Sequence, residues 1–368
     1  MPRIVLSTAG THGDYLAFAG LGRALVARGH DVVVAVNAAA HALFRDAGLA
    51  VVACGRPYGE EEARSHVQLF DEWNPLPKSE RSRILREIFD REENDRDLAA
   101  ACEGADLLVA ISLQPAARRV HEELKIPWVA VSLLPADFAR GKPTYARATR
   151  TLLASSRHYS EPKTNFSSLR MTGFWFPDRF HAAPPLEVES FLAAGDPPVV
   201  LSFGSLPVRN AREVVAIHAR AARQIGLRLL VQRGWANLDL EEEGVLVTGA
   251  LSHDWLFPRS AAVIHHAGAG VTARAIRHAC PMVVEPYGRD QFFNAWRTTH
   301  LGIGVTMHPH RLTVDGLSRA LDRAMSAPFT TRLAALSELI RAEDGYGIAC
   351  DEIDDLIHQK YPERSDHV

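Results

Sequence analysis

The stretch AAVIHHAGAGVTARAIRHACP, residues 261–281, contains an apolar run, a turn of small residues and an amphipathic segment, in that order. The apolar run is typical of a buried strand, and the amphipathic segment has the spacing of a helix. In open α/β sheets, strands lead through short turns into helices, and ligands bind at the carboxyl ends of the strands. This stretch therefore predicts a strand, a turn and a helix of an α/β domain, with a ligand site at the turn.

The same alternation of apolar runs and helical segments fills both halves of the chain. The runs in the first half are RIVLS, DVVVAV, AVVAC, DLLVAIS and WVAVSLL, and those in the second half are VVLSFGS, LRLLVQRG, VLVTGA, AAVIHH, MVVEP and IGVTM. Continuous apolar strands separated by helices indicate parallel sheets that are covered on both faces. Residues from about 180 to 198 carry four prolines and no strand pattern.

These patterns predict an α/β protein with two Rossmann-like, doubly wound domains in tandem. We assign residues 1–180 to an N-terminal domain, 181–197 to a linker and 198–345 to a C-terminal domain. Residues 346–368 are expected to form a C-terminal helix that can pack on either domain.

Composition excludes several classes of protein. The 368 residues are 47% hydrophobic and 23% charged, with a net charge of −3, so a broad basic face for nucleic acid is not expected. The four scattered cysteines suit free thiols in a reducing compartment. The first residues do not resemble a signal peptide, and no apolar run reaches the roughly 20 residues of a membrane span. We therefore expect a cytoplasmic protein without a membrane span.

The charged stretch KSERSRILREIFDREENDRDLAAA, residues 78–101, has helical spacing and predicts one solvated helix in the first domain. A basic face for a membrane or an acidic partner is the alternative, against which the interleaved acidic residues argue. Tyr15, Phe70 and Trp73 could form an aromatic platform for a ligand, although core packing is the more common use of such side chains.

The turn at residues 266–270 has the chemistry of an anion site. Gly268, Ala269 and Gly270 allow an anion to approach the positive end of the following helix. His266 and Thr272 could add an imidazole N–H and a hydroxyl. The turn matches neither the Walker pattern nor G-x-G-x-x-G, and a plain tight turn would also explain the glycines. A shared metal is disfavoured, because neighbouring side chains on a strand point to opposite faces.

Beyond the turn, several motifs occur in a fixed order. They are HDWLF at residues 253–257, HHAGAGVT at 265–272, CP at 280–281 and DQ at 290–291. This segment resembles the donor-binding region of family 1 glycosyltransferases, above all the bacterial natural-product enzymes and the sterol glucosyltransferases. PVVLSFGSLP, TGFWFPD and the opening LSTAGTHGDYLAFAGLGRALVARGHDV also resemble family segments. Residues 58–105 and 137–170 match the family little.

The resemblance implies the GT-B architecture, in which two Rossmann-like domains face each other across a cleft. It implies that the C-terminal domain binds a nucleotide-sugar donor, with UDP or dTDP as the nucleotide, and that the N-terminal domain binds a small-molecule acceptor. The reaction it implies is an inverting hexosyl transfer in natural-product or antibiotic biosynthesis. No metal and no cofactor are expected, because the nucleotide sugar is a co-substrate.

The resemblance also assigns roles to individual residues. His266, Gly268, Ala269, Gly270 and Thr272 fall at the donor diphosphate, and Gly204 and Ser205 could touch the same phosphates. Asp290 and Gln291 fall where the family binds the sugar hydroxyls, although Asp290 could equally cap a helix. Trp235 is a candidate for contact with the nucleotide base, and packing is the alternative. Gly13 is grouped with the donor-binding residues.

Asp14 falls where the family places its general base, which takes the proton from the acceptor hydroxyl. An ordinary aspartate is a weak base, and His12, which replaces the family's arginine, is the alternative base or a phosphate contact. Asp14 could also cap the following helix.

Three departures from the family keep other functions open. Ala250 or Leu251 stands where plant relatives stack a tryptophan, Arg274 stands where they bind ribose through a glutamate, and Val271 replaces a threonine. The alternative role of Arg274 is a contact with a phosphate. The alternatives are a non-catalytic relative that binds nucleotide sugar and a nucleotide-sugar epimerase of the same fold.

Overall fold

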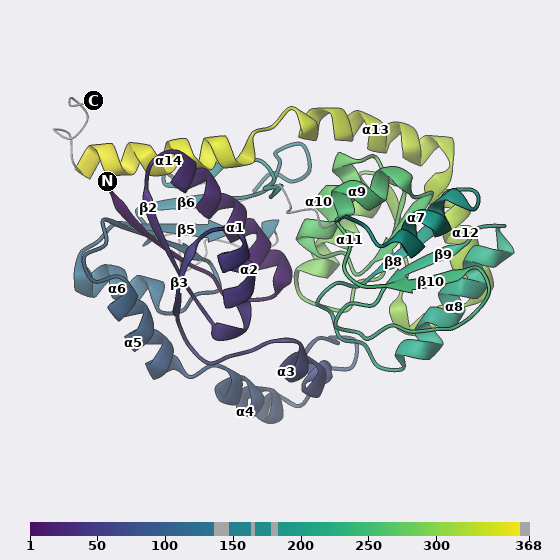
Figure 1. Cartoon of the computed structure of the whole chain (residues 1–368), viewed down its shortest axis with the longest axis horizontal. Coiled ribbons are helices and arrows are strands. Elements are labelled where there is room, and N and C mark those ends of the chain that lie inside the picture. The colour runs from purple at the N-terminus through teal and green to yellow at the C-terminus, as the bar shows by residue number, and fades with distance from the viewer. Residues whose placement is uncertain (136–146, 163–165, 178–182, 361–368) are drawn as a thin grey trace. The chain divides into compact units, whose positions relative to one another are not determined.

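The computed structural model describes residues 1–135, 147–162, 166–177 and 183–360, which fall into two compact units (Figure 1). The first unit contains residues 1–59, 77–178 and 343–368, and the second contains residues 60–76 and 179–342. Each unit is built on one parallel sheet. The predicted fold class, two doubly wound parallel-sheet domains, is therefore confirmed.

The first unit has a seven-stranded sheet in the order β3-β2-β1-β4-β5-β6-β7. Its strands are β1 (Arg3–Ser7), β2 (Asp31–Val36), β3 (Ala50–Ala53), β4 (Leu107–Ile111), β5 (Trp128–Ser132), β6 (Arg150–Leu153) and β7 (Leu169–Met171). Its helices are α1 (His12–Ala27), α2 (His41–Asp46), α4 (Lys78–Ile88), α5 (Arg91–Ala101), α6 (Ala117–Leu124) and α14 (Gly345–Lys360).

Strand β1 shows why these runs are apolar throughout. Ile4 and Leu6 belong to the core on one face of the sheet, and Val5 belongs to the core on the other face. Because successive side chains of a strand alternate between faces, a sheet covered on both sides needs an apolar residue at every position.

Two strands of this sheet were missed in the sequence analysis. β6 and β7 are only 4 and 3 residues long, and they lie within or next to the region that matches the family little. Both pair in parallel at the edge of the sheet. Arg150 and Thr151 in β6 and Arg170 in β7 interrupt the apolar character of these runs, so neither shows a continuous apolar pattern in the sequence.

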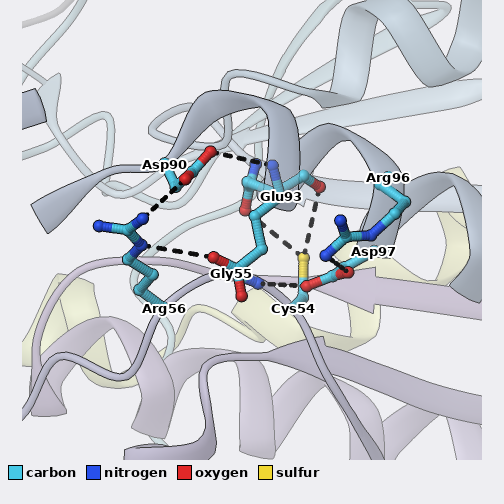
Figure 2. A network of polar contacts seen from close by, with 8 residues as sticks. Cys54, Gly55, Arg56, Asp90, Glu93, Arg96 and Asp97 are labelled. Atoms are coloured by element: carbon cyan, nitrogen blue, oxygen red, sulfur yellow. Dashed lines mark hydrogen bonds and ion pairs between the residues drawn. The ribbon is translucent and has the colours of Figure 1, made fainter. Parts of the chain in front are cut away.

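The charged stretch at residues 78–101 forms two helices, α4 and α5, so the prediction of a single helix is wrong. The Asp90 side chain accepts a hydrogen bond from the Glu93 backbone N–H and caps the start of α5. The same carboxylate accepts a bond from Arg56, and Gly55 donates its N–H to Asp97 (Figure 2). An aspartate followed three residues later by a glutamate is a helix-start signal that this stretch contained.

The second unit has a six-stranded sheet in the order β10-β9-β8-β11-β12-β13. Its strands are β8 (Val199–Ser202), β9 (Leu229–Gln232), β10 (Val245–Thr248), β11 (Ala262–His265), β12 (Met282–Val284) and β13 (Gly304–Thr306). Its helices are α3 (Glu60–Ser65), α7 (Leu186–Ala193), α8 (Ala211–Gln224), α9 (His253–Leu256), α10 (Ala269–Arg277), α11 (Asp290–His300), α12 (Val314–Met325) and α13 (Ala327–Arg341).

The two units do not follow the predicted domain limits at every point. Residues 60–76 belong to the second unit, although they lie within the predicted N-terminal domain. The predicted linker, residues 181–197, contains helix α7, and its residues 181 and 182 lie outside the described residues.

The C-terminal helix α14 packs on α1 of the first unit (Figure 1). Arg28, the C-cap of α1, pairs with Asp351 and Asp354, and the Tyr346 hydroxyl donates to the Ala17 carbonyl oxygen. Gly20 makes room for Tyr346, because a Cβ at this position would lie 2.1 Å from the phenolic oxygen. Residues 361–368 of the predicted helix lie outside the described residues.

The four cysteines are buried free thiols. Over the part of the chain that the structure describes, no helix combines the length and the apolar character that a bilayer crossing requires.

Candidate functional site

The order of the second sheet reverses between β8 and β11, which lie side by side at the centre of the sheet. The chain continues from β8 in one direction and from β11 in the other, so the turns after these two strands diverge and leave space between them. Gly204 follows β8, and a Cβ at this position would lie 3.8 Å from Cε1 of His266, which follows β11. The structure thus brings Gly204 and His266 together at this switch point.

The turn after β9 joins the same edge. The Trp235 N–H donates to the Gly204 carbonyl oxygen over 2.8 Å. Gly204 and Gly234 both have positive φ, and a Cβ at Gly234 would lie 2.5 Å from the Gly204 oxygen, so these turns require glycine. Ser205 and Trp235 are both half-buried next to this contact.

The His266 ring lies directly over Gly268. A Cβ at Gly268 would lie 2.5 Å from Nε2 of His266, so the glycine provides the space for the imidazole. Burial lowers the pKa of His266 to about 4, which makes the ring neutral at physiological pH. A neutral imidazole carries one N–H donor and one acceptor nitrogen.

The neighbouring His265 has a different environment. It is fully buried, burial lowers its pKa to about 3, and its Nδ1 accepts the Ala267 N–H. This nitrogen shapes the turn at Ala267, which has a φ of 62°. His265 is therefore a structural residue of the turn.

Helix α10 begins at this turn with Gly268 as its N-cap, and no side chain caps it. The first N–H groups of a helix have no partner within the helix, and they lie at the positive end of its dipole. Ala269 is half-buried and Gly270 is exposed. The predicted anion site is thus an uncapped helix start with a neutral histidine beside it.

Two other side chains of α10 are engaged within the protein. The Thr272 hydroxyl donates to the Gly268 carbonyl oxygen over 2.8 Å, so the structure does not direct this predicted donor to the open side of the turn. Arg274 is buried and pairs with Asp254 over 3.2 Å, and His278 bonds the same carboxylate over 2.8 Å. Burial alone would raise the pKa of Asp254, but the bonds from His278 and Arg274 hold it well below its usual range.

The histidine of the HDWLF motif has a structural role at the same edge. His253 approaches Gln232 Oε1 over 3.0 Å, and the Ser202 hydroxyl donates to the same oxygen over 2.7 Å. Gln232 in turn donates to the Leu251 carbonyl oxygen. The motif thereby ties the carboxyl ends of β8 and β9 to the loop before α9. These bonds fix the positions of the strand ends from which the site is built.

Asp290 and Gln291 are the first two residues of α11. Asp290 is therefore not the N-cap, which is Arg289, with φ 56° and ψ −129°. The side-chain oxygen of Gln291 accepts the N–H groups of Tyr287 and Gly288 over 2.7 and 3.2 Å. Gln291 thus holds the turn before the helix, and its amide nitrogen is the group that it can offer to a ligand.

In the first unit, α1 begins after β1 with Thr11 as its N-cap. Asp14 is the third helical residue, and its Oδ2 accepts the Thr11 N–H over 2.7 Å in a capping box. The expected capping role of Asp14 is thus present, and the side chain is half-buried. The carboxylate adds to the effect of burial in raising the pKa of Tyr15 above its usual range.

His12 and Gly13 are exposed at the same helix start. Residues two apart on a helix do not face each other, so His12 and Asp14 project in different directions. A Cβ at Gly13 would meet no described atom within 4 Å, so packing of the described residues does not require this glycine.

Comparison with known proteins identifies the family. The model described as "Erythromycin biosynthesis protein CIII-like, C-terminal domain" matches residues 241–344. The O-mycaminosyltylonolide 6-deoxyallosyltransferase of Streptomyces fradiae is 30% identical over 420 aligned positions, which cover 95% of this chain and 96% of the relative. The chain belongs to the family 1 glycosyltransferases.

Two further similarities agree with this family. Glycosyltransferase GtfE of Amycolatopsis orientalis is 29% identical to this chain. The alignment covers 98% of this chain and 99% of GtfE. The crystal structure of glycosyltransferase VinC in complex with dTDP has a TM-score of 0.74 at 19% identity, covering 97% of this chain and all of that one. The predicted GT-B fold and the predicted enzyme class, a hexosyltransferase, are confirmed.

One set of residues at this edge is not indicated by the sequence alone. Glu72 and Trp73, from the region without family motifs, bond the turn before α11, and Trp73 packs on His308. Phe70 packs against the core of the second unit. No local pattern in the sequence shows that residues from the first half of the chain reach the second sheet.

Proposed function

We propose that this glycosyltransferase transfers a hexose or deoxyhexose from a UDP or dTDP sugar to a hydroxyl group of a small-molecule natural product. We propose further that the anomeric carbon is inverted. The donor class is supported by relatives with similar folds, one of which was solved with dTDP. The sugar class is supported by the name of the 6-deoxyallosyltransferase relative.

The observation that carries the donor site is the uncapped start of α10 with the His266 ring over Gly268. An anion placed there would meet the free N–H groups of the helix beside the His266 ring, which also bonds the Ser202 backbone. In the proposed reaction these groups take up the charge that develops on the leaving diphosphate. Fixed N–H donors carry that charge in this proposal, so neither a metal nor a cofactor is required.

Asp290 and Gln291 are proposed to bind the donor sugar. The side-chain oxygen of Gln291 accepts a hydrogen bond from the turn, so its two amide N–H groups can donate to sugar oxygens. The half-buried Asp290 carboxylate can accept hydrogen bonds from adjacent hydroxyls. Trp235 remains the candidate for contact with the nucleotide base, because it lies half-buried beside Gly204.

Asp14 is proposed as the general base. It would accept the proton from the acceptor hydroxyl as the hydroxyl oxygen bonds the anomeric carbon and the bond from that carbon to the diphosphate breaks. The proton then resides on Asp14, and the electron pair leaves with the diphosphate. His12 is the alternative base, and because it projects differently from Asp14, the two side chains are separate candidates rather than a pair.

The proposal is tested by incubating the protein with UDP-glucose, dTDP-glucose and dTDP-rhamnose and a panel of macrolide, glycopeptide and sterol aglycones. Nucleotide release and product mass report transfer, and the anomeric coupling constant in the proton NMR spectrum reports stereochemistry. We expect an inverted product whose rate of formation survives EDTA. A retained anomer would exclude inversion, and loss of activity in EDTA that Mg²⁺ restores would exclude the metal-free diphosphate site. Donor binding without transfer to any acceptor would favour a non-catalytic relative.

A further inference from the structure

Residues 60–76 lie between β3 and α4 in the sequence, yet they are part of the second unit. Arg64 on α3 donates its Nε–H to the Trp235 carbonyl oxygen over 3.0 Å. Phe70 packs against the second core, beneath the Arg289 guanidinium at 5.9 Å from its ring centre. The segment is thus fastened to the second unit both at its start and near its middle.

The segment bonds the turn that precedes Asp290. The Glu72 N–H donates to the Tyr287 carbonyl oxygen over 2.8 Å, and the Trp73 indole N–H donates to the Pro286 carbonyl oxygen over 2.7 Å. From the opposite side, Gln291 accepts the N–H groups of Tyr287 and Gly288. The carbonyl groups of the turn are therefore held by residues 72 and 73, and its N–H groups by Gln291.

The turn is both close to the segment and conformationally unfavourable. A Cβ at Gly288 would lie 2.8 Å from Cγ of Glu72, so only glycine fits beneath this side chain. The next residue, Arg289, has φ 56° and ψ −129°, which is strained for a residue with a side chain. Such a conformation persists only where the surroundings fix it, and here the surroundings are Glu72, Trp73 and Gln291.

Trp73 is itself fixed from two sides. Its ring lies 5.0 Å from that of Phe292 on α11 and 4.0 Å from that of His308, measured between centroids. Asp71 accepts a hydrogen bond from His310 over 2.9 Å. The side chains of residues 71 and 73 therefore anchor the segment on α11 and on the loop after β13.

We propose that residues 71–73 are positioning residues for the donor sugar: they hold the turn at residues 286–289 and thereby place Asp290 and Gln291. This inference rests on the proposed function, in which those two residues bind the sugar of a nucleotide sugar. It removes Trp73 and Phe70 from the expected acceptor platform, since both are engaged by the second unit.

Trp73→Phe tests the proposal, because phenylalanine keeps an aromatic ring for His308 and Phe292 but lacks the N–H that holds Pro286. The matched control is Trp296→Phe, which changes an exposed tryptophan further along α11. Titration calorimetry with UDP, dTDP, UDP-glucose and dTDP-glucose is combined with steady-state kinetics. A net hydrogen bond of about 0.5–1.5 kcal/mol predicts a roughly 2- to 13-fold weaker binding of the nucleotide sugar.

In the expected result, the donor KM rises with the Kd for nucleotide sugar, while the Kd for UDP or dTDP and the acceptor KM stay unchanged. Equal weakening of nucleotide and nucleotide sugar, or a rise in the acceptor KM alone, would overturn the proposal. A wild-type protein that binds no nucleotide sugar would refute the proposed function and this inference with it. A wild-type protein that binds one while Trp73→Phe has no effect would refute only the inference.

A second pair of variants tests the contact between Gly288 of the turn and the Glu72 side chain. Gly288→Ala places a methyl group against the Glu72 side chain and should also weaken nucleotide-sugar binding. Adding Glu72→Ala removes the obstructing Cγ, whereas the remaining Cβ, 3.3 Å away, is tolerable, so the double variant should regain part of the affinity. Thermal melts confirm that each variant is folded. Failure of the second change to restore any affinity would show that Glu72 does not act through this turn.

Discussion

Each unit contains a helix that follows a strand through a tight turn, but the starts of the two helices are capped differently. In each, a strand leads through a tight turn into a helix, α1 after β1 and α10 after β11. At α1 the Asp14 carboxylate accepts the Thr11 N–H and occupies the helix start, whereas at α10 the cap is Gly268 and no side chain occupies it. A glycine makes room in both turns, because a Cβ at Gly10 would lie 2.2 Å from Asp14 Oδ2 and one at Gly268 would lie 2.5 Å from His266 Nε2.

This difference separates the two chemistries that the reaction needs. A carboxylate at a helix start repels phosphate and is suited to accept a proton or orient a hydroxyl. An open helix start beside a neutral imidazole attracts phosphate. The way in which the helix start is capped, and not the sheet topology, therefore distinguishes the proposed acceptor edge from the proposed donor edge.

The strongest test of the comparison is Asp14→Asn. Asparagine keeps a side-chain oxygen for the Thr11 N–H, so α1 should remain capped, but it cannot accept the acceptor's proton. Turnover should fall by roughly 10²–10⁴, the range for a positioned general base, with donor affinity unchanged. Steady-state kinetics and donor titration measure the two quantities.

The matched control is Asp90→Asn, which makes the same change at the capped start of α5. It should leave turnover at the wild-type level. If Asp14→Asn retains turnover while His12→Ala loses it, the base is His12, and the α1 carboxylate is only a cap.

His266→Ala tests the donor side of the comparison. The N–H that the ring offers to a charged phosphate is worth about 1.5–3 kcal/mol, which predicts a roughly 10- to 150-fold weaker binding of UDP or dTDP. Binding of uridine or thymidine, which lack the diphosphate, should not change. His300→Ala, at the exposed end of α11, is the control. Equal losses for nucleoside and nucleotide would remove His266 from the diphosphate.

The pH dependence of the same variant separates a neutral from a charged ring. Burial holds the pKa of His266 at about 4, so the ring is neutral above roughly pH 5.5. The difference in affinity between wild type and His266→Ala should then stay constant from about pH 5.5 to 8. A difference that grows as the pH falls below the ordinary histidine pKa of about 6.5 would show that the ring binds as a cation.

The sequence predicted the fold because its information is local. Apolar runs such as those of β1 and β11 are continuous, and each is followed by a glycine-containing turn and a helix. The positions of His266 and Gly268 could be predicted for the same reason, because residues that directly follow a strand lie at its carboxyl end. It also contained the cap at Asp90, which was overlooked in favour of one long helix.

The missing parts of the prediction depend on contacts between distant residues. Trp73 and Pro286 are 213 positions apart, and nothing near Trp73 indicates that its N–H bonds that carbonyl group. Arg274 raised the expectation of a phosphate contact because its pairing with Asp254, which also bonds His278, could not be inferred from spacing alone. The sequence also does not show where a side chain points within one helix turn. The hydroxyl of Thr272, for example, donates to the Gly268 carbonyl oxygen.

Thr272→Val is expected to have the smallest effect. Its hydroxyl donates to the Gly268 carbonyl oxygen, and its side chain is 1% exposed, so the variant should lose about 0.5–1.5 kcal/mol of unfolding free energy and no affinity for UDP or dTDP. Thr330→Val, near the start of α13, removes a hydroxyl that bonds the carbonyl four residues earlier and also that of Ala327, and serves as the stability control. Urea unfolding and calorimetry compare the two variants. If Thr272→Val weakens diphosphate binding tenfold while Thr330→Val does not, the hydroxyl must turn toward the phosphate when donor binds. The α10 start would then offer the donor a side-chain hydroxyl in addition to its backbone N–H groups, as the family resemblance implies.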